Sequence, residues 1–220
     1  MRATELFSRE EILDLTRSSD LRGAGSVAVD WGLVATSLGL VAAWPHPLTV
    51  GVALFVIGGR QLGLAVLTHE CAHRSLFRTR WLNDFAGTWL LGAPVWTDVH
   101  RYRVHHRKHH IGTGGPGDPD LGLVEPFPTT RGSLARKIGR DLIGVTAIRR
   151  IVGLLAMDFG FIGYTASTGV ERLGPIPLSQ RLRLGVRHLG PVVLTNAGLF
   201  GILAAAGHPA LYLVWVGAWC

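Results

Sequence analysis

The chain has 220 residues, of which 48% are apolar, and its 22 Lys and Arg outnumber its 15 Asp and Glu to give a formal net charge of +7. A mean hydropathy of +0.30 is high for a soluble domain, and two cysteines are too few for a disulfide framework. The basic residues lie in loops that flank apolar stretches, as is typical of membrane proteins, so we expect no nucleic acid partner.

Residues 1–22 are polar and of mixed charge, so we do not expect a signal peptide here. Ser8 and Glu11 have the S-x-x-E spacing of a capping box, which predicts a short amphipathic helix that begins near Arg9. We therefore assign residues 1–22 to an N-terminal cytoplasmic amphipathic segment.

Two long apolar stretches follow. Residues 23–59 contain one charged residue, Asp30. A helix needs about 20 apolar residues to cross a bilayer, and residues 26–44 and 47–68 each satisfy this requirement. The sequence WPHP at 44–47 predicts a turn between them. Residues 23–68 thus form a first predicted transmembrane hairpin.

A second predicted hairpin occupies residues 188–220, which contain no Asp, Glu, Lys or Arg. Residues 189–205 predict a third span, GHP at 207–209 predicts a turn, and residues 210–220 begin a fourth span. Neither turn carries Lys or Arg, so the positive-inside rule places residues 69–187 in the cytoplasm. The predicted fold is all-α: a multi-pass protein of a bacterial inner membrane or its equivalent, with two transmembrane hairpins and a cytoplasmic His-rich helical cap at 69–187.

Two shorter apolar stretches lie within this cap, at residues 81–96 and 151–164. Both are too short to cross easily and contain polar residues, so we expect interfacial or re-entrant helices. Trp81, Trp89 and Trp96 suit the headgroup level of a bilayer.

Seven of the ten histidines lie between residues 69 and 110. His69 and His73 share one face of a helix at i, i+4 spacing, and His106, His109 and His110 share a face of a second helix. Neutral imidazole is the commonest side-chain ligand of transition metals. The arginines and the lysine interleaved with the second group would lower the proton affinity of the imidazoles and would face lipid phosphates or a partner.

Two simpler interpretations remain open at this point. The sequence HRYRVHHRKHH at 100–110 is also typical of a basic patch that binds anionic lipid. HECAH at 69–73 matches the HExxH motif of zinc metalloproteases, in which Glu70 would act as the general base. A protease of this kind would leave the second histidine group unexplained, whereas five imidazoles suit a pair of metal ions.

Four features together resemble the membrane fatty acid desaturase and hydroxylase superfamily: THECAHRSLF at 68–77, Asn83, YRVHHRKHH at 102–110 and DPDL at 118–121. The resemblance implies two iron ions, O2 as co-substrate, a lipid acyl substrate and an electron donor such as a ferredoxin or a cytochrome b5-like protein. The activity it implies is acyl-lipid desaturation. Hydroxylation or ketolation of a lipid or carotenoid, an intramembrane zinc protease and a non-catalytic binding module are the alternatives.

The resemblance also implies roles for individual residues. The metal ligands would be His69, His73, His106, His109 and His110, and Glu70 would orient a ligand imidazole. In this family the histidine groups are called boxes, so that His69 and His73 form the first box and His106, His109 and His110 form the second. Asp118 and Asp120 would orient the loop after the second box or form an ordinary turn. Trp96 and Tyr102 would line a substrate path or anchor the interface. The family's third box would follow the fourth span. The 220 residues are therefore expected to be the N-terminal part of a longer protein, inactive without the rest.

Overall fold

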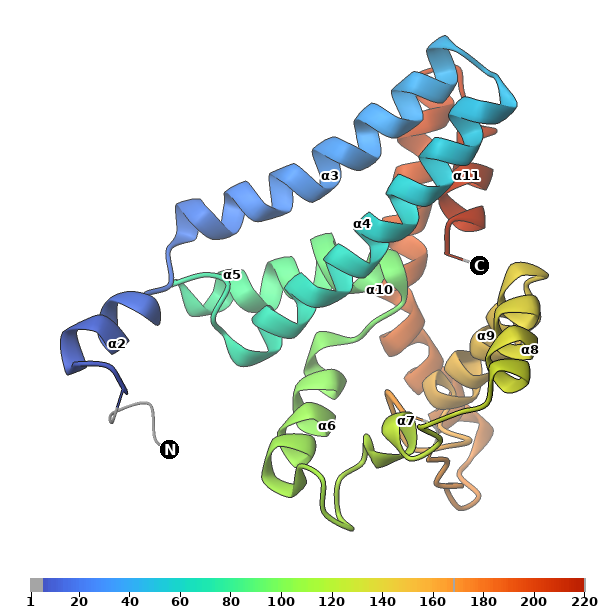
Figure 1. Ribbon diagram of the computed structural model, residues 1–220. Coiled ribbons are helices and arrows are strands. Elements are labelled where there is room, and N and C mark those ends of the chain that lie inside the picture. The colour runs from blue at the N-terminus through green and yellow to red at the C-terminus, as the bar shows by residue number, and fades with distance from the viewer. Residues whose placement is uncertain (1–5, 168, 220) are drawn as a thin grey trace.

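The computed structural model describes residues 6–167 and 169–219, which form helices, turns and one isolated bridge between Ile162 and Arg172 (Figure 1). Three helices are long and apolar enough to cross a membrane: α3, α4 and α10. The expected all-helical architecture is thus confirmed for the described residues. In chain order the helices are α2 (Arg9–Leu15), α3 (Asp20–Ala43), α4 (Pro47–His73), α5 (Arg80–Phe85), η1 (Ala86–Gly92), η2 (Ala93–Val95), α6 (Val99–Gly112), α7 (Leu121–Val124), α8 (Arg131–Leu142), α9 (Val145–Asp158), α10 (Leu178–Ala205) and α11 (Leu211–Gly217).

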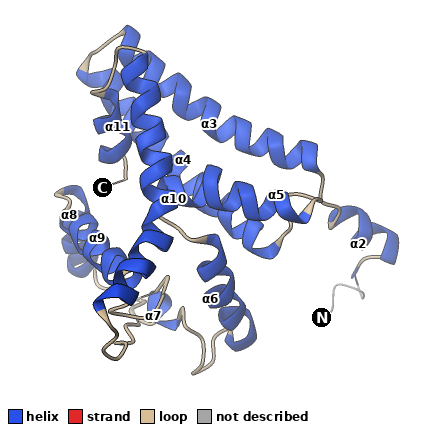
Figure 2. Ribbon diagram, turned by 180° about the vertical axis from the view of Figure 1, so that it is seen from behind, coloured by secondary structure: helices blue, strands red, loops and turns tan. Residues whose placement is uncertain are grey.

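The long helices coincide with three of the predicted apolar spans, and α2 begins at the predicted capping box. Ser8 Oγ accepts from the backbone N–H of Glu11, and the Glu11 carboxylate accepts from the N–H of Ser8 at 2.8 Å. Helices α3 and α4 share a turn at one end and diverge beyond it, as both views show (Figures 1 and 2). The fourth predicted apolar stretch forms only the short helix α11, whose C-terminal end returns toward α4.

The core between α3, α4 and α11 is built around Trp215, whose exposed fraction is 2%. Its ring stacks on Trp31 with the centroids 5.7 Å apart, and its carbonyl accepts from Gln61 Nε2 at 2.8 Å. These contacts satisfy polar groups that would be costly to bury unpaired. They fix α11 against the two longer helices.

An ion pair joins α3 and α4 within their apolar stretches. Arg60 Nη1 lies 2.8 Å from Asp30 Oδ1, and Asp30 is 5% exposed. Gly63 leaves room for the pair, since a Cβ at that position would lie 2.8 Å from the carboxylate oxygens. Pairing lowers the cost of holding either charge among apolar helices.

The segment between the two histidine groups is a bent helix made of α5, the π-helical turn η1 and the 3₁₀ turn η2, and it lies along the C-terminal half of α4 (Figure 1). Trp31 Nε1 donates to Leu90 O at 2.8 Å, and Asn196 Nδ2 lies 3.4 Å from Pro94 O. The segment ends at Trp96, in the left-handed region with φ 58°. It is not among the helices long enough to cross a membrane, which agrees with the expectation for residues 81–96.

Candidate metal centre

The first histidine group lies at the C-terminal end of α4. The helix stops at His73, and Arg74 adopts a left-handed conformation with φ 60°. The following turn is held by the fully buried Asn83, whose Nδ2 donates to Phe77 O at 2.8 Å and whose Oδ1 accepts from Phe77 N at 3.1 Å. This turn sends the chain back along α4 and so toward the start of α6.

The second histidine group lies on α6, which Asp98 caps by accepting from the backbone N–H groups of His100 and Arg101. Arg103 joins α6 to the end of α4. Its guanidinium donates to Ala72 O at 2.9 Å and to Cys71 O at 3.0 Å, and it pairs with Asp84 Oδ1 at 2.6 Å. The carbonyls at a helix C-terminus have no partners within their own helix and carry partial negative charge, so a guanidinium stabilises them.

Arg101 makes a second inward contact. It pairs with Asp158 Oδ1 of α9 at 2.6 Å, and Trp96 Nε1 donates to Asp158 Oδ2 at 2.9 Å. The expectation that the cationic residues between the histidines face lipid or a partner is therefore wrong for Arg101 and Arg103. For Arg107 and Lys108, whose side chains are exposed, it stays a prediction.

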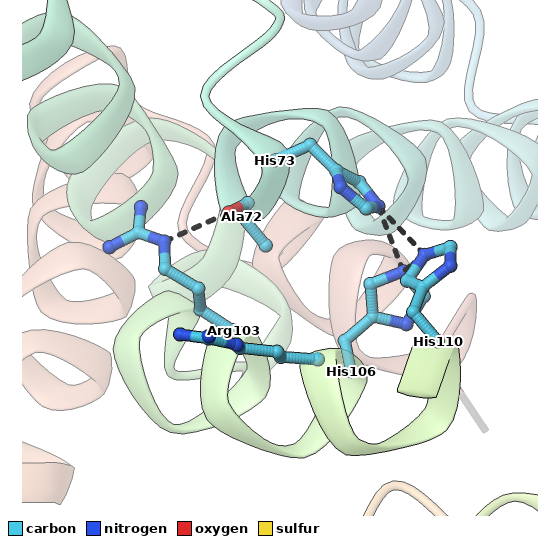
Figure 3. A pocket seen from close by; sticks show the side chains of 6 residues that line it. Ala72, His73, Arg103, His106 and His110 are labelled. Carbon is cyan, nitrogen blue, oxygen red and sulfur yellow. Dashed lines mark hydrogen bonds between the residues drawn. The ribbon is translucent and has the colours of Figure 1, made fainter. Parts of the chain in front are cut away.

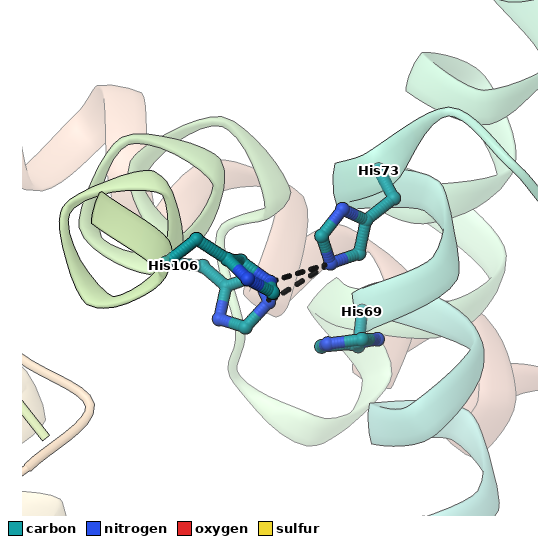
Figure 4. A group of neighbouring side chains, drawn as sticks. His69, His73 and His106 are labelled. Atoms are coloured by element: carbon teal, nitrogen blue, oxygen red, sulfur yellow. Dashed lines mark hydrogen bonds between the residues drawn. The ribbon is translucent and has the colours of Figure 1, made fainter. Parts of the chain in front are cut away.

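Four imidazoles from the two helices form one cluster: His69, His73, His106 and His110 can place one ring nitrogen each within 4.8 Å of one another. Figure 4 shows three of them, His69, His73 and His106. The Nε2 atoms of His73 and His106 are 2.9 Å apart, those of His106 and His110 are 2.9 Å apart, and those of His73 and His110 are 3.3 Å apart (Figure 3). A cavity of about 440 Å³ opens beside this cluster, between His73, Arg103 and Arg107.

The cluster fits a transition-metal ion. Imidazole nitrogens that bind one ion at about 2.1 Å lie roughly 3.0 to 3.4 Å from each other, which is close to the spacing of the three Nε2 atoms. The Nδ1 of His106 is buried without a hydrogen-bond partner. The polar contacts of this ring are therefore made through Nε2, the nitrogen that faces the cluster.

The charge state of His106 supports the same role. Burial, followed by repulsion from His69, His110, His73 and His109, lowers the pKa of His106 to about 4. The ring is therefore neutral near pH 7 and retains a lone pair for a metal. The sequence predicted a lowered proton affinity but assigned it to the interleaved arginines and lysine, whereas burial and the neighbouring imidazoles cause it.

His109, the fifth predicted ligand, lies to one side. Its ring centroid is 5.6 Å from that of His106, and its Nδ1 lies 2.7 Å from Asp118 Oδ1. His109, Asp118 and Asp120 form a second group whose ligand atoms lie within 4.8 Å of one another. Hydrogen bonding to Asp118 raises the pKa of His109, and hydrogen bonds from Gly114, His109 and Asp120 lower the pKa of Asp118 to about 2.

The other predicted site residues lie as follows. Glu70 Oε1 is 3.0 Å from His69 Nδ1, and its second oxygen accepts from Ser75 Oγ at 2.7 Å. Tyr102 stacks on His106, with centroids 5.2 Å apart and planes at 10°. Trp96 lies away from the cluster, where it bonds to Asp158 and lines an apolar cavity of about 260 Å³.

Several residues near the centre escaped the sequence analysis. His188 of α10 bonds to Asp98 at 3.1 Å, and Asp84 and Asp158 hold the arginines of α6. No spacing rule connects these partners, because they lie 19 to 90 residues apart in the sequence. Among the described histidines, the cluster gathers its members from α4 and α6 alone.

The fold and the centre together define a class: helical proteins with apolar helices of membrane-spanning length and a candidate metal site made of imidazoles from two helices. The sequence profile of the fatty acid desaturase family matches residues 43–220, and the chain belongs to this family. No solved structure shows a significant match to the chain.

Three curated relatives show the range of named activities. The chain is 33% identical over 109 residues to an sn-1 acyl-lipid omega-3 desaturase (ferredoxin) of Nostoc sp. (strain 36), covering 47% of this chain and 26% of the relative. It is 33% identical to the dihydrorhizobitoxine desaturase of Bradyrhizobium elkanii, over 52% of this chain and 34% of the relative. It is 36% identical to the beta-carotene 4-ketolase of Protosiphon botryoides, over 38% of this chain and 21% of the relative. The matches thus cover about a fifth to a third of these relatives.

Proposed function

We propose that the chain is the metal-binding part of an O2-dependent, di-iron acyl-lipid desaturase that introduces a double bond into a lipid acyl chain. The observation that carries this proposal is the triangle of Nε2 atoms from His73, His106 and His110, because it joins both boxes at one point. Membership of the desaturase family and the acyl-lipid desaturases among the relatives support the substrate class.

Each residue has a defined part in the proposal. His69, His73, His106 and His110 would hold iron through one nitrogen each, and His109 would contribute to the second ion. Glu70 would orient His69, and Tyr102 would cover one face of His106. Bound iron, supplied with O2 and with electrons from a ferredoxin or cytochrome b5-like donor, provides the oxidising power that removal of hydrogen from an alkyl chain requires.

The proposal includes a membrane arrangement. Residues 23–68 and 188–220 would form two transmembrane hairpins in a bacterial inner membrane or its equivalent, with residues 1–22 and the His-rich cap 69–187 in the cytoplasm. The three apolar helices support it. So does the charge distribution, since Lys and Arg are absent from both inter-helix turns.

A ketolase or hydroxylase of the same superfamily is the second candidate, because a beta-carotene 4-ketolase is among the relatives. A zinc protease is less well supported. Its Glu70 would have to face the metal-bound water as a base, whereas the carboxylate here bonds to His69 and Ser75.

Anaerobic Fe(II) titration of the purified protein tests the proposal. Replacing His106 with Ala should abolish tight Fe(II) binding, while His100→Ala on the same helix should leave it intact, because His100 is exposed and outside the cluster. Production of the full-length protein that contains this chain should also increase the unsaturated acyl chains in the membrane lipids of the host. Tight binding of a single zinc ion with no iron, or Fe(II) binding that survives His106→Ala, would refute the di-iron proposal.

A further inference from the structure

Two histidines of α6 are held by two aspartates of the loop that follows it. His109 Nδ1 lies 2.7 Å from Asp118 Oδ1, and His105 Nε2 lies 2.8 Å from Asp120 Oδ1. The loop itself is tied together by Asp118, whose Oδ2 accepts from Gly114 N at 2.9 Å and whose Oδ1 accepts from Asp120 N at 2.9 Å. These two backbone hydrogen bonds hold the Asp118 carboxylate in place independently of its bond to His109.

The direction of the hydrogen bond to His109 follows from these contacts. Two backbone N–H groups donate to Asp118, and they stabilise it as an ionised carboxylate, which can only accept. The Nδ1 of His109 must therefore carry the proton. In the neutral ring this leaves the lone pair on Nε2, the nitrogen on the other side of the ring.

The two aspartates treat their histidines differently. Asp120 engages His105 through Nε2, so that ring is anchored by the nitrogen that ligands in the cluster use. Asp118 engages His109 through Nδ1 and leaves Nε2 free. His69 in the first box is held in the same way as His109, because Glu70 Oε1 lies 3.0 Å from Nδ1 of His69. Carboxylates that bond to the outer nitrogen of a ligand histidine fix its tautomer and ring orientation.

We propose that Asp118 is a positioning residue that holds His109 as the Nδ1–H tautomer with Nε2 free for a metal ion, while Asp120 anchors the neighbouring His105 and so fixes the rotation of α6. The assignment of a metal to His109 rests on the proposed function. The tautomers themselves do not, because they follow from hydrogen bonds within the chain.

Nitrogen-15 NMR of histidine-labelled, metal-free protein at mildly alkaline pH tests the proposal. The signals of His109 are identified by their loss in His109→Gln. We expect His109 to be protonated at Nδ1 and His105 at Nε2. In Asp118→Ala the His109 tautomer should change while that of His105 stays, and Asp120→Ala should do the reverse. Finding His109 protonated at Nε2 in the unaltered protein would overturn the proposal, whether or not the aspartate variants fold.

Cobalt(II) added to the same samples separates this proposal from the proposed function. If the four cluster histidines show paramagnetic shifts but His109 is protonated at Nε2, the positioning role of Asp118 is overturned and the metal site is not. Absence of those shifts, with His109 protonated at Nδ1, would overturn the metal site and support the tautomer assignment.

Metal affinity supplies a third measurement. Removing the hydrogen-bond partner of a ligand histidine typically weakens metal binding about 10- to 100-fold. The Co(II) affinity measured from the His109 signals should therefore fall by this factor in Asp118→Ala. Asp141→Ala is the matched control, since Asp141 bonds to Lys137 and Thr146 of the α8–α9 region, and it should leave the affinity unchanged. Equal affinities in all three proteins would contradict the positioning role.

Discussion

At the scale of single residues, the arginines and histidines that alternate along α6 have different roles. Arg101 and Arg103 contact α9 and the end of α4, whereas His106 and His110 join the cluster and His105 and His109 bond to the loop aspartates. The arginines hold the helix in place, and His106 stays neutral through burial and repulsion from the neighbouring imidazoles. Arginines alternate with histidines in this sequence because one short helix, α6, is held by α9 on one side and by the end of α4 on another.

Glu70 provides a prediction at this scale. Replacing Glu70 with Gln keeps an oxygen that can accept from His69 Nδ1 but removes the charge that strengthens the bond. We expect Fe(II) affinity to fall by less than the roughly 10- to 100-fold typical of losing such a partner, and Glu70→Ala to reach that range. Calorimetric titration compares the three proteins. Unchanged affinity in both variants would show that the hydrogen bond to His69 contributes nothing.

Helical geometry explains which members of the histidine cluster could be predicted from the sequence. The i, i+4 pairs His69–His73 and His106–His110 join the cluster, as their shared faces imply. At about 100° per residue, His110 lies about 40° from His106 on one side and His109 about 60° on the other. The end of α4 approaches on the His110 side, so His109 is left facing Asp118. Whether His109 or His110 joins the cluster depends on how α6 packs against α4, and no local sequence pattern specifies that packing.

At the scale of elements, Arg103 connects the two helices that carry the boxes. Replacing Arg103 with Lys removes the planar fork that reaches Ala72 O, Cys71 O and Asp84 together. We expect a loss of about 1.5 to 3 kcal/mol in the free energy of unfolding, the range for a hydrogen bond to a charged group, and weaker Fe(II) binding. Chemical unfolding in detergent measures the first quantity.

Arg107→Lys serves as the control for Arg103, because Arg107 is exposed one turn further along α6. It should change the free energy of unfolding by less than about 0.5 kcal/mol, as surface substitutions usually do. If Arg103→Lys proved as mild as this control, the bonds from α6 to the end of α4 would not be what holds the two boxes together.

The bent segment between the boxes depends on Gly92. A Cβ at this position would meet the carbonyl oxygens of Thr97 and Gly87, the latter at 2.6 Å, and backbone atoms cannot move aside as a flexible side chain can. Gly92→Ala should therefore lower the free energy of unfolding by about 1 to 3 kcal/mol, the usual range for overpacking. The midpoint of thermal unfolding in detergent is the measurement.

Gly59→Ala in α4 is the matched control, since a Cβ there meets nothing within 4 Å. Alanine favours a helix over glycine by up to about 1 kcal/mol, so this variant should be as stable as the unaltered protein or more so. A Gly92→Ala protein of unchanged stability would mean that the bend at η1 and η2 relaxes without cost.

The apolar spans were predictable from composition, because length and hydropathy determine them, and α3, α4 and α10 match residues 26–44, 47–68 and 189–205. The path of residues 80–95 was predictable only in part. Their shortness indicated that they do not cross, but the bend comes from contacts such as Trp31 with Leu90 and Asn196 with Pro94. Partners 59 and 102 residues apart leave no periodic signal in the sequence.

At the scale of the whole molecule, apolar side chains cover the outside of the long helices. Leu21 of α3, Phe55 of α4 and Ile202 of α10 are 84%, 86% and 69% exposed. Exposed apolar surface of this extent marks a site of contact with protein or membrane. Together with helices of spanning length, it favours lipid as the surroundings of α3, α4 and α10.

The proposed orientation predicts which parts of the chain face each compartment. The turns at His46 and His208 lie at the ends of the long helices away from the metal centre, whereas Gly115 follows α6 next to it. With Cys220 replaced by Ser, cysteines introduced singly at positions 46 and 208 should react with a membrane-impermeant maleimide in intact cells, and a cysteine at position 115 only after lysis. The buried Cys71 should stay unreactive in both conditions. Labelling of 46 and 115 from the same side would contradict the crossing of α4, and labelling of 115 alone in intact cells would place the histidine cluster outside the cell, away from the cytoplasmic electron donors that the proposed reaction requires.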